Sequence, residues 1–233
     1  MSATDLSIIV PVLDEEAGIA STLQALEPLR ARGVEVIVVD GASRDRTVAI
    51  ATPLCTKLIA ASRGRASQMN AGAAAARGQV LLFLHADTRL PESADRLVLE
   101  GLAASRRAWG RFDVRIEGDH PLFPVIAAMM NLRSRLTGIA TGDQAIFVLR
   151  DTFAAVGGFP AIPLMEDIAL SRRLKRLGQP LCLAARASTS GRRWEKHGVV
   201  RTVLLMWRLR LAFFFGAEPA TLARIYGYVP RQP

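Results

Sequence analysis

Short apolar runs alternate along the first half of the chain with segments whose apolar residues recur every three or four positions. The apolar runs predict buried strands, at residues 6–12, 34–39, 58–60 and 80–84. The periodic segments predict helices, at residues 17–29, 45–51, 66–76 and 92–104, with Ser43 expected to cap the second of them. Such alternation indicates an α/β fold with a mostly parallel central sheet and helices on both faces.

The pattern is less regular in the second half, where three strands and two helices are expected. The strands are predicted at residues 110–117, 145–149 and 181–185, and the helices at 124–136 and 166–177. Residues 199–216 are apolar, but Arg201, Arg208 and Arg210 interrupt them, which argues against a membrane-spanning helix. This segment is expected either to lie in a membrane interface or to pack on the domain or a second subunit. We therefore expect one domain over residues 1–195 and a C-terminal helical appendage over 196–233.

Acidic residues follow three of the predicted strands. Asp14 and Glu15 come after the first strand, Asp40 ends the second, and Asp87 follows the strand at 80–84. One such Asp is weak evidence, because Asp is common in turns and helix caps. Ligands of parallel sheets bind beyond the carboxyl ends of the strands, however, so three acidic strand ends predict a binding site there.

The positive net charge is compatible with several kinds of anionic partner. Lys and Arg number 30 against 21 Asp and Glu, a formal net charge of +9, and nearly all the cations are arginine. Arginine favours bidentate contacts with phosphate or carboxylate, which suggests a nucleotide, nucleic acid, anionic lipid or phosphorylated substrate; codon bias is an equally good explanation of the excess. Aromatic residues make up only 6% and no nucleic-acid motif occurs, so no nucleic-acid partner is expected.

Several chemistries and locations are disfavoured. Cys55 and Cys182 form no CxxC pair, and there are only three histidines, so neither a disulfide framework nor a closed zinc site is expected. No nucleophile elbow, HExxH or P-loop motif occurs. The first apolar run is too short for a signal peptide, which favours a cytoplasmic protein, with peripheral contact at the inner face of the cell membrane as the alternative.

Four segments together resemble one known family. They read IVPVLDEE at 9–16, VVDGASRDRT at 38–47, AARG and LFLHAD within 75–87, and MED and LSRRL within 165–174. Over about residues 5–195 the chain resembles the family 2 glycosyltransferases, which have the GT-A fold. The form HAD at 85–87, with RGR at 63–65 and QMN at 68–70, looks like a bacterial subgroup called radical-SAM/selenodomain-associated transferases.

The resemblance implies a nucleotide-sugar donor, expected to be UDP-linked. The family's first segment reads P-x-x-N-E and holds the nucleotide, which corresponds here to Pro11, Asp14 and Glu15, with Asp replacing the usual Asn. Asp40 corresponds to the residue that contacts the base. Arg65 is expected to reach a phosphate or to be an ordinary surface arginine.

The family's D-x-D segment is His85-Ala86-Asp87 in this chain. The resemblance assigns Asp87 as the ligand of a divalent metal, Mn²⁺ or Mg²⁺, that binds the donor diphosphate. His85 replaces the first Asp; it is expected to donate a hydrogen bond to ribose or phosphate, or else to ligate the metal, which Mn²⁺ would tolerate better than Mg²⁺.

The resemblance places the general base in the pair Glu166 and Asp167. Asp167 would deprotonate an acceptor hydroxyl, which predicts inversion at the anomeric carbon. Acidic residues are also favoured in the first turn of any helix, and the two roles are compatible.

Acceptor-side residues are expected from two further segments. Asp143 and Gln144 resemble the family's acceptor loop, with a plain turn as the alternative. Arg193 and Trp194 keep the end of a Q-x-x-R-W motif, in which Arg193 would hold the diphosphate and Trp194 would stack on the acceptor, with a basic turn and a buried Trp as the alternative. Ser190 replaces the Gln of that motif, which argues against a polymer-making synthase.

Two other functions remain open. A sugar-1-phosphate nucleotidyltransferase uses a related sheet, but its glycine-rich loop and downstream lysine are missing after the first strand. A basic, non-catalytic scaffold at a membrane would also explain the charge. The sequence does not identify the sugar or the acceptor, and it leaves a homodimer open.

Overall fold

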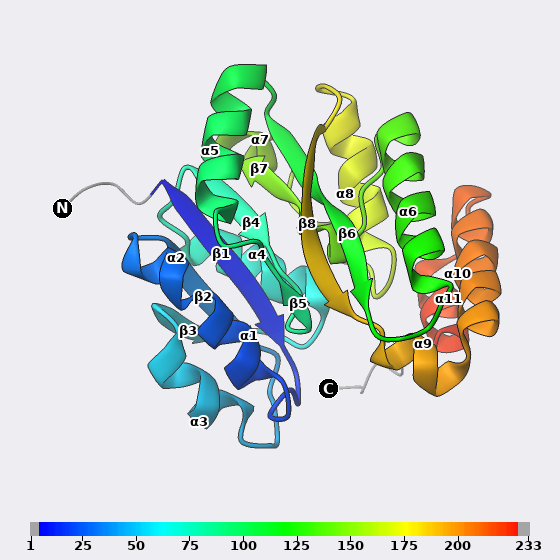
Figure 1. Cartoon of the computed structure of the whole chain (residues 1–233), viewed down its shortest axis with the longest axis horizontal. Helices are drawn as coiled ribbons and strands as arrows, with labels where there is room; N and C mark the ends of the chain where they lie inside the picture. Colours follow the sequence, from blue (N-terminus) through cyan, green and yellow to red (C-terminus); the bar gives the residue numbers. More distant parts are fainter. Residues whose placement is uncertain (1–4, 228–233) are drawn as a thin grey trace.

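The strands form one eight-stranded sheet, in the order β3-β2-β1-β4-β7-β6-β8-β5. The structure is a computed structural model, and it describes residues 5–227 apart from the side chain of Arg193. Figure 1 shows the sheet crossed by helices on both faces, with the last helices gathered at one side. The predicted α/β architecture is confirmed.

The first half of the sheet consists of parallel strands. They are β1 (Leu6–Val12), β2 (Glu35–Asp40), β3 (Lys57–Ala60) and β4 (Val80–Phe83). Ile8 and Val10 belong to the core on one face, and Ile9 belongs to the core on the other. Burial on both faces explains why these strands read as continuous apolar runs in the sequence.

The second half is mixed. It contains β5 (Thr88–Arg89), β6 (Trp109–Glu117), β7 (Phe147–Leu149) and β8 (Leu181–Ser190). β7 runs antiparallel to both β4 and β6, whereas β6 and β8 are parallel. The predicted strand at 181–185 is five residues too short: small and polar residues fill 186–190, and they are held by pairing with β6 and β5 rather than by their own apolar pattern.

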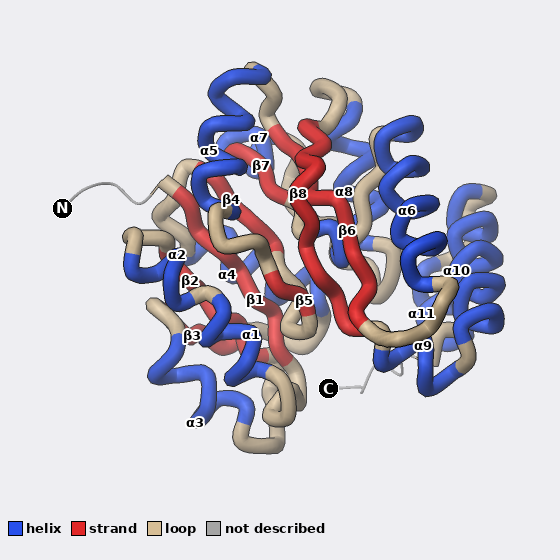
Figure 2. Tube along the Cα trace, in the orientation of Figure 1, coloured by secondary structure: helices blue, strands red, loops and turns tan. Residues whose placement is uncertain are grey.

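The helices fall into two layers, which Figure 2 shows on either side of the strands. One face is covered by α1 (Ile19–Ala25), α2 (Glu27–Ala31), α3 (Thr47–Ala51) and α5 (Ala94–Ser105), with a short 3-10 turn at Thr52–Leu54. The other is covered by α4 (Arg65–Ala75), α7 (Arg150–Ala155) and α8 (Glu166–Lys175). α6 (Phe123–Thr137) packs on β6.

Two details of the helix predictions are wrong. The expected helix at 17–29 is two helices, because Pro28 has no N–H to continue a helix and lies in the first turn of α2 instead. Ser43 does not cap α3, which begins at Thr47. The Ser43 hydroxyl instead accepts a hydrogen bond from the Asp14 backbone N–H, across the gap between two loops.

The C-terminal segment forms α9 (Arg192–His197), α10 (Val199–Phe214) and α11 (Pro219–Ile225). Val199 packs with Phe123 of α6, and Leu209 packs with Ile168 of α8. α10 therefore covers the domain through its inner face. Within residues 5–227, no helix combines the length and apolarity that crossing a bilayer would require.

A buried carboxylate fixes the start of β2 against its neighbours. Glu35 is 3% exposed and accepts hydrogen bonds from the Ser7 hydroxyl at 2.6 Å, the Arg77 backbone N–H at 2.8 Å and the Arg77 Nε at 3.0 Å. Burial alone would raise the pKa of Glu35, but these hydrogen bonds outweigh it, and the pKa lies below the ordinary 4.5. The ionised form therefore stabilises the fold.

We expect Glu35→Gln to lower the free energy of unfolding by about 1–3 kcal/mol at neutral pH, because it weakens acceptance from buried donors. Since the folded pKa lies below the unfolded one, the contribution is present above pH 4.5 and is lost as pH falls through the folded pKa. Urea unfolding at about pH 7 and about pH 3.5 measures this difference. Glu100→Gln, at an exposed position of α5, is the matched control. An equal gap between wild type and Glu35→Gln at both pH values would contradict the assignment.

Candidate functional site

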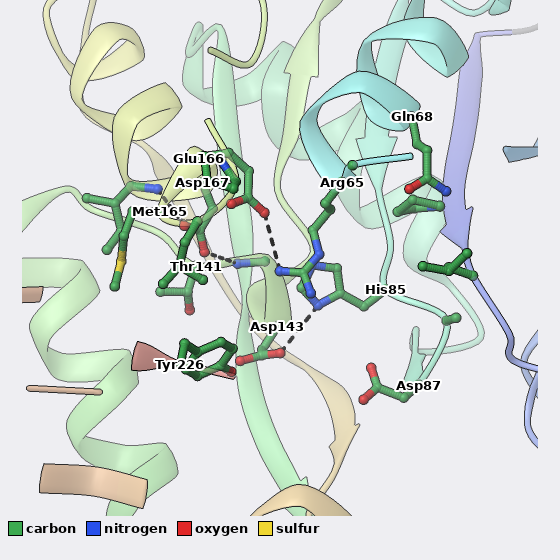
Figure 3. Close-up of a pocket in the computed structure, with 18 of the residues that line it drawn as sticks. Arg65, Gln68, His85, Asp87, Thr141, Asp143, Met165, Glu166, Asp167 and Tyr226 are labelled. Carbon is green, nitrogen blue, oxygen red and sulfur yellow. Dashed lines mark hydrogen bonds and ion pairs between the residues drawn. The ribbon is translucent and has the colours of Figure 1, made fainter. Parts of the chain in front are cut away.

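A cavity of about 360 Å³ opens at the carboxyl ends of β1 and β4. Its walls come from the loops after these strands, the start of α4, the segment before β7, the start of α8, α10, and the residues that follow α11. Figure 3 shows side chains from these separate segments converging on one space. Eight of the predicted site residues line this cavity: Pro11, Glu15, Arg65, His85, Asp87, Asp143, Glu166 and Asp167.

Hydrogen bonds join the loops that follow β1 and β2. The Asp14 carboxylate accepts from the Arg44 N–H at 2.8 Å, and the Thr47 hydroxyl accepts from the Glu15 N–H at 2.7 Å. Asp45 accepts from the Glu16 N–H at 3.0 Å. These hydrogen bonds therefore fix the loops after β1 and β2 relative to each other at the rim of the cavity.

Two of the predicted nucleotide ligands lie in this loop framework rather than on the cavity wall. Asp40 is buried and accepts hydrogen bonds from the backbone N–H groups of Ala42 and Ser43. Asp14 has a positive φ of 54° and its carboxylate is engaged by Arg44. Neither residue is among those that line the cavity.

Gln68 also shapes this wall, and sequence analysis gave it no role. Its side-chain amide donates to the backbone carbonyls of Val12 and Val39, each at 2.8 Å, and so ties α4 to the ends of β1 and β2. A Cβ atom at Gly41 would lie 2.9 Å from the Gln68 amide, which explains the glycine after Asp40. The polar residue within the apolar face of α4 was the available signal.

His85 and Asp143 come together although 58 positions separate them in the chain. His85 Nδ1 lies 3.4 Å from Asp143 Oδ1. Burial would raise the pKa of Asp143, but the hydrogen bond and charge of His85, and then the charges of Arg65 and Arg210, lower it. Asp143 is therefore an anion at the cavity wall, and Figure 3 shows its contact with the His85 ring.

Gly142 allows this contact and also holds Asp167. A side chain at position 142 would overlap the imidazole ring of His85, so the ring rests directly on the glycine backbone. The Gly142 N–H donates to Asp167 Oδ2 at 2.8 Å, and the Ile168 N–H donates to Oδ1 at 2.7 Å. Two backbone donors thus fix the Asp167 carboxylate while leaving acceptor sites on each oxygen.

Glu166 and Arg65 form the opposite wall. Glu166 is 2% exposed, and its Oε1 lies 3.3 Å from Arg65 Nη1. Burial raises the pKa of Glu166, Arg65 lowers it, and the adjacent Asp167 raises it again, so that the pKa stands above its ordinary value. Arg65 is half-exposed at the start of α4, and it lines the cavity while it is paired with Glu166.

The remaining predicted residues occupy different surroundings. Gln144 is fully buried, and its side-chain oxygen accepts from the Thr141 N–H at 3.2 Å while its amide donates to Asn131. Trp194 lines a neighbouring cavity and packs beside α6. The Arg193 backbone belongs to α9, and its side chain lies outside the described residues.

The C-terminal helices add wall residues that sequence analysis missed. Met206 and Arg210 of α10, and Tyr226 after α11, all line the cavity. Arg210 lies one position after the buried Leu209 and four after Met206, whereas Arg201 and Arg208 are exposed. This helical spacing was the signal that could have separated Arg210 from the other two arginines.

The site offers few protein ligands to a divalent cation. In the described ranges, no three His, Cys, Asp or Glu side chains are grouped so that they could hold a metal ion. Asp87 is an exposed residue that lines the cavity. The pKa of Glu15 is raised, first because Glu15 is partly buried and then because the negative charge of Asp87 is nearby. Mg²⁺-like ions are commonly held by one or two carboxylates together with substrate phosphates. The donor set therefore fits a metal that binds together with a phosphate-bearing ligand.

Solved structures share the fold. The mannosyltransferase PcManGT of Pyrobaculum calidifontis, in complex with GDP-Man and Mn²⁺, superimposes with a TM-score of 0.66 at 19% identity over 98% of this chain and 65% of its own. S. aureus TarS 1–349 gives a TM-score of 0.65 at 17% identity, over 80% of this chain and 60% of its own. At such identities, the likeness shows the GT-A fold alone.

Among curated proteins, an uncharacterized glycosyltransferase of Haemophilus influenzae is 32% identical over 97 residues, which cover 40% of this chain and 33% of that protein. The chain thus spans less than two thirds of the length of each of these relatives. Residues 7–157 match the family described as Glycosyl transferase family 2. That match includes β1, β2 and β4 with the loops that line the cavity, and it extends over most of the chain: the protein belongs to glycosyl transferase family 2.

Proposed function

We propose that this enzyme transfers a sugar from a nucleotide-diphosphate donor, with UDP as the nucleotide, to an acceptor hydroxyl with inversion. The observation that carries the proposal is the position of Asp167, whose carboxylate lines the same cavity as Asp87 and is held by the Gly142 N–H. S. aureus TarS 1–349 is known in complex with UDP and with UDP-GlcNAc, and glucosyl-3-phosphoglycerate synthase of Mycobacterium tuberculosis with Mn²⁺ and UDP-glucose. The bacterial subgroup resemblance stays a prediction.

The donor would bind between the rim loops and α4. Pro11 and Glu15 line this side of the cavity, and Asp40 acts by holding the turn beneath it. Arg65 supplies a guanidinium suited to a phosphate, and Glu166 orients that guanidinium through the ion pair. The nucleotide contacts of Asp14 and Arg193 stay predictions from the family resemblance.

Asp167 would act as the general base. Its two backbone hydrogen bonds hold the carboxylate in place, and the free lone pairs can accept the proton of an acceptor hydroxyl. The attack forms the new glycosidic bond as the bond from the anomeric carbon to the diphosphate oxygen breaks, so the proton passes to Asp167 and the electron pair leaves with the nucleotide. One displacement inverts the anomeric centre, since no covalent glycosyl-enzyme forms.

Asp87 would hold a divalent metal, Mn²⁺ or Mg²⁺, together with the donor diphosphate. The bound metal supplies charge neutralisation for the leaving nucleotide. His85 would donate to the ribose or phosphate from its place against Gly142, with Asp143 orienting the imidazole ring. Trp194, Asp143 and Gln144 stay proposed acceptor-side residues, with Gln144 acting through the backbone turn that it caps.

Asp167→Asn should lower turnover by about 10²–10⁴-fold, because the amide cannot accept the acceptor proton. UDP binding should stay within about threefold of wild type, since the substitution keeps the size of the side chain. Turnover is measured as UDP release from a panel of UDP-sugars, and binding by calorimetry. Asp151→Asn, at an exposed position in the first turn of α7, is the control. Near-normal turnover of Asp167→Asn would contradict the proposal that Asp167 is the general base.

Calorimetric titration with UDP should show heat that depends on Mn²⁺. Asp87→Asn should weaken UDP binding about tenfold or more when Mn²⁺ is present and change it little with EDTA, because the carboxylate contributes through the metal. Asp119→Asn, exposed in the loop after β6, serves as the control. A non-catalytic scaffold would give no metal-dependent heat. Formation of pyrophosphate from UTP and a sugar 1-phosphate would instead favour the nucleotidyltransferase.

A further inference from the structure

A second cavity of about 280 Å³ lies beside the first, between α6, α9 and α10. The two cavities share five lining residues, which are Asp87, Asp143, Met206, Arg210 and Tyr226. A molecule in the second cavity would therefore meet the proposed donor site along this common wall. The proposed donor site does not use this space.

Most of the second cavity is apolar. Met129 and Met130 of α6, Trp194 of α9 and Trp207 of α10 all line it. Thioether and indole groups pack against aliphatic chains without requiring hydrogen bonds. These walls suit an apolar portion of a ligand.

Two arginines also line this cavity, Arg133 from α6 and Arg210 from α10. The Nε and Nη2 atoms of Arg133 and the Nε of Arg210 are buried, and they have no hydrogen-bond partner in the described part of the chain. Burial, and then the like charge of Arg210, lower the pKa of Arg133 to about 10. Buried donors without acceptors are costly, and an anion placed between two guanidinium groups would relieve both desolvation and repulsion.

The neighbouring carboxylates offset these charges only in part. Asp167 raises the pKa of Arg133, and Arg210 lowers that of Asp143, so both acids lie within electrostatic reach. Neither acid accepts a hydrogen bond from the unpartnered nitrogen atoms. The open donor positions therefore remain for a ligand.

The outer faces of α6 and α10 are apolar as well. Val125, Met129, Leu132 and Leu136 recur at helical spacing on α6, and all are exposed. On α10 the exposed side chains are Val200, Leu204, Trp207, Leu211 and Phe214. Surface helices usually present polar residues to water. Apolar surroundings on both helices that bound the cavity favour a ligand that itself carries an apolar chain.

We propose that the second cavity is the acceptor site, and that the acceptor is an amphiphile whose anionic group binds Arg133 and Arg210 while its apolar chain lies between α6 and α10. This inference rests on the proposed function, because it assigns the molecule that receives the sugar. The shared wall brings such an acceptor alongside Asp143 and toward Asp167, which lines the adjoining cavity.

Binding of decyl phosphate, below its micelle concentration, tests the proposal. Trp194 and Trp207 line the cavity and report binding by fluorescence, against a constant background from the fully buried Trp109. Arg133→Gln should weaken decyl phosphate binding by about 10–100-fold, as expected for the loss of charge-assisted hydrogen bonds. The control is Arg208→Gln, which removes the same charge from an exposed position of α10 and should bind like wild type. Equal weakening in both variants would overturn the proposal.

Binding of different ligands to the wild-type protein tests separately the roles of the anionic group and of the apolar chain. Inorganic phosphate and the neutral decyl glucoside should each bind at least about tenfold more weakly than decyl phosphate. Inorganic phosphate that bound equally well would show that the apolar chain has no role, and equal binding of decyl glucoside would show that the anion has none. Either result overturns the assignment.

Two further measurements keep the outcomes distinct. Arg133→Lys retains the positive charge, so it should show a smaller loss than Arg133→Gln if that charge attracts the anion; equal losses would contradict a role for the charge. UDP binding with Mn²⁺ is measured on every variant and should be unchanged in Arg133→Gln. Failure of wild-type UDP binding would reject the donor assignment, whereas failure of decyl phosphate binding alone would reject only the acceptor assignment.

Discussion

The reversal of the chain at β7 is the constraint on which the site depends. β7 lies between β4 and β6 and runs antiparallel to both, with Phe147 opposite Leu82. The residues that precede β7 must therefore lie next to those that follow β4. This places Gly142 and Asp143 against His85, and it lets the Gly142 N–H bind Asp167. If β7 ran parallel to β4, the residues that precede it would lie at the opposite end of the strands, away from the residues that follow β4.

The parallel half of the fold could be predicted from the sequence because its strands are buried on both faces and read as unbroken apolar runs. The same reasoning located Glu15 and Asp87 at one edge of the sheet, where the cavity lies. The ends of α2 and β8 could not be predicted in this way. Pro28 divides an otherwise periodic helix, and residues 186–190 form a strand only because β5 and β6 pair with them.

The site residues that sequence analysis missed share one physical reason. Gln68 acts by bridging the carbonyls of two strands, and Arg210 acts from a helix that reaches the cavity only through tertiary packing. Gln68 belongs to the QMN segment at 68–70 and Arg210 to the apolar segment at 199–216, but neither pattern indicates what the side chain contacts. Conversely, Asp40 stands at the expected strand end, yet its carboxylate accepts backbone hydrogen bonds in the turn. The pattern locates a carboxylate at the edge, but only the hydrogen bonds indicate whether it faces a ligand or supports the loop.

The charges of the site form an ordered arrangement rather than a uniform patch. Arg65 and Glu166 form an ion pair on one side, and Asp143 is held as an anion by His85. Arg133 and Arg210 line the second cavity, and three of their buried nitrogen atoms have no acceptor within residues 5–227. A phosphate-bearing donor and an anionic acceptor would repel each other if they shared one open cavity. Arg65 and Arg210 line the first cavity, and Arg133 and Arg210 line the second, so each place where an anion is expected has arginines beside it.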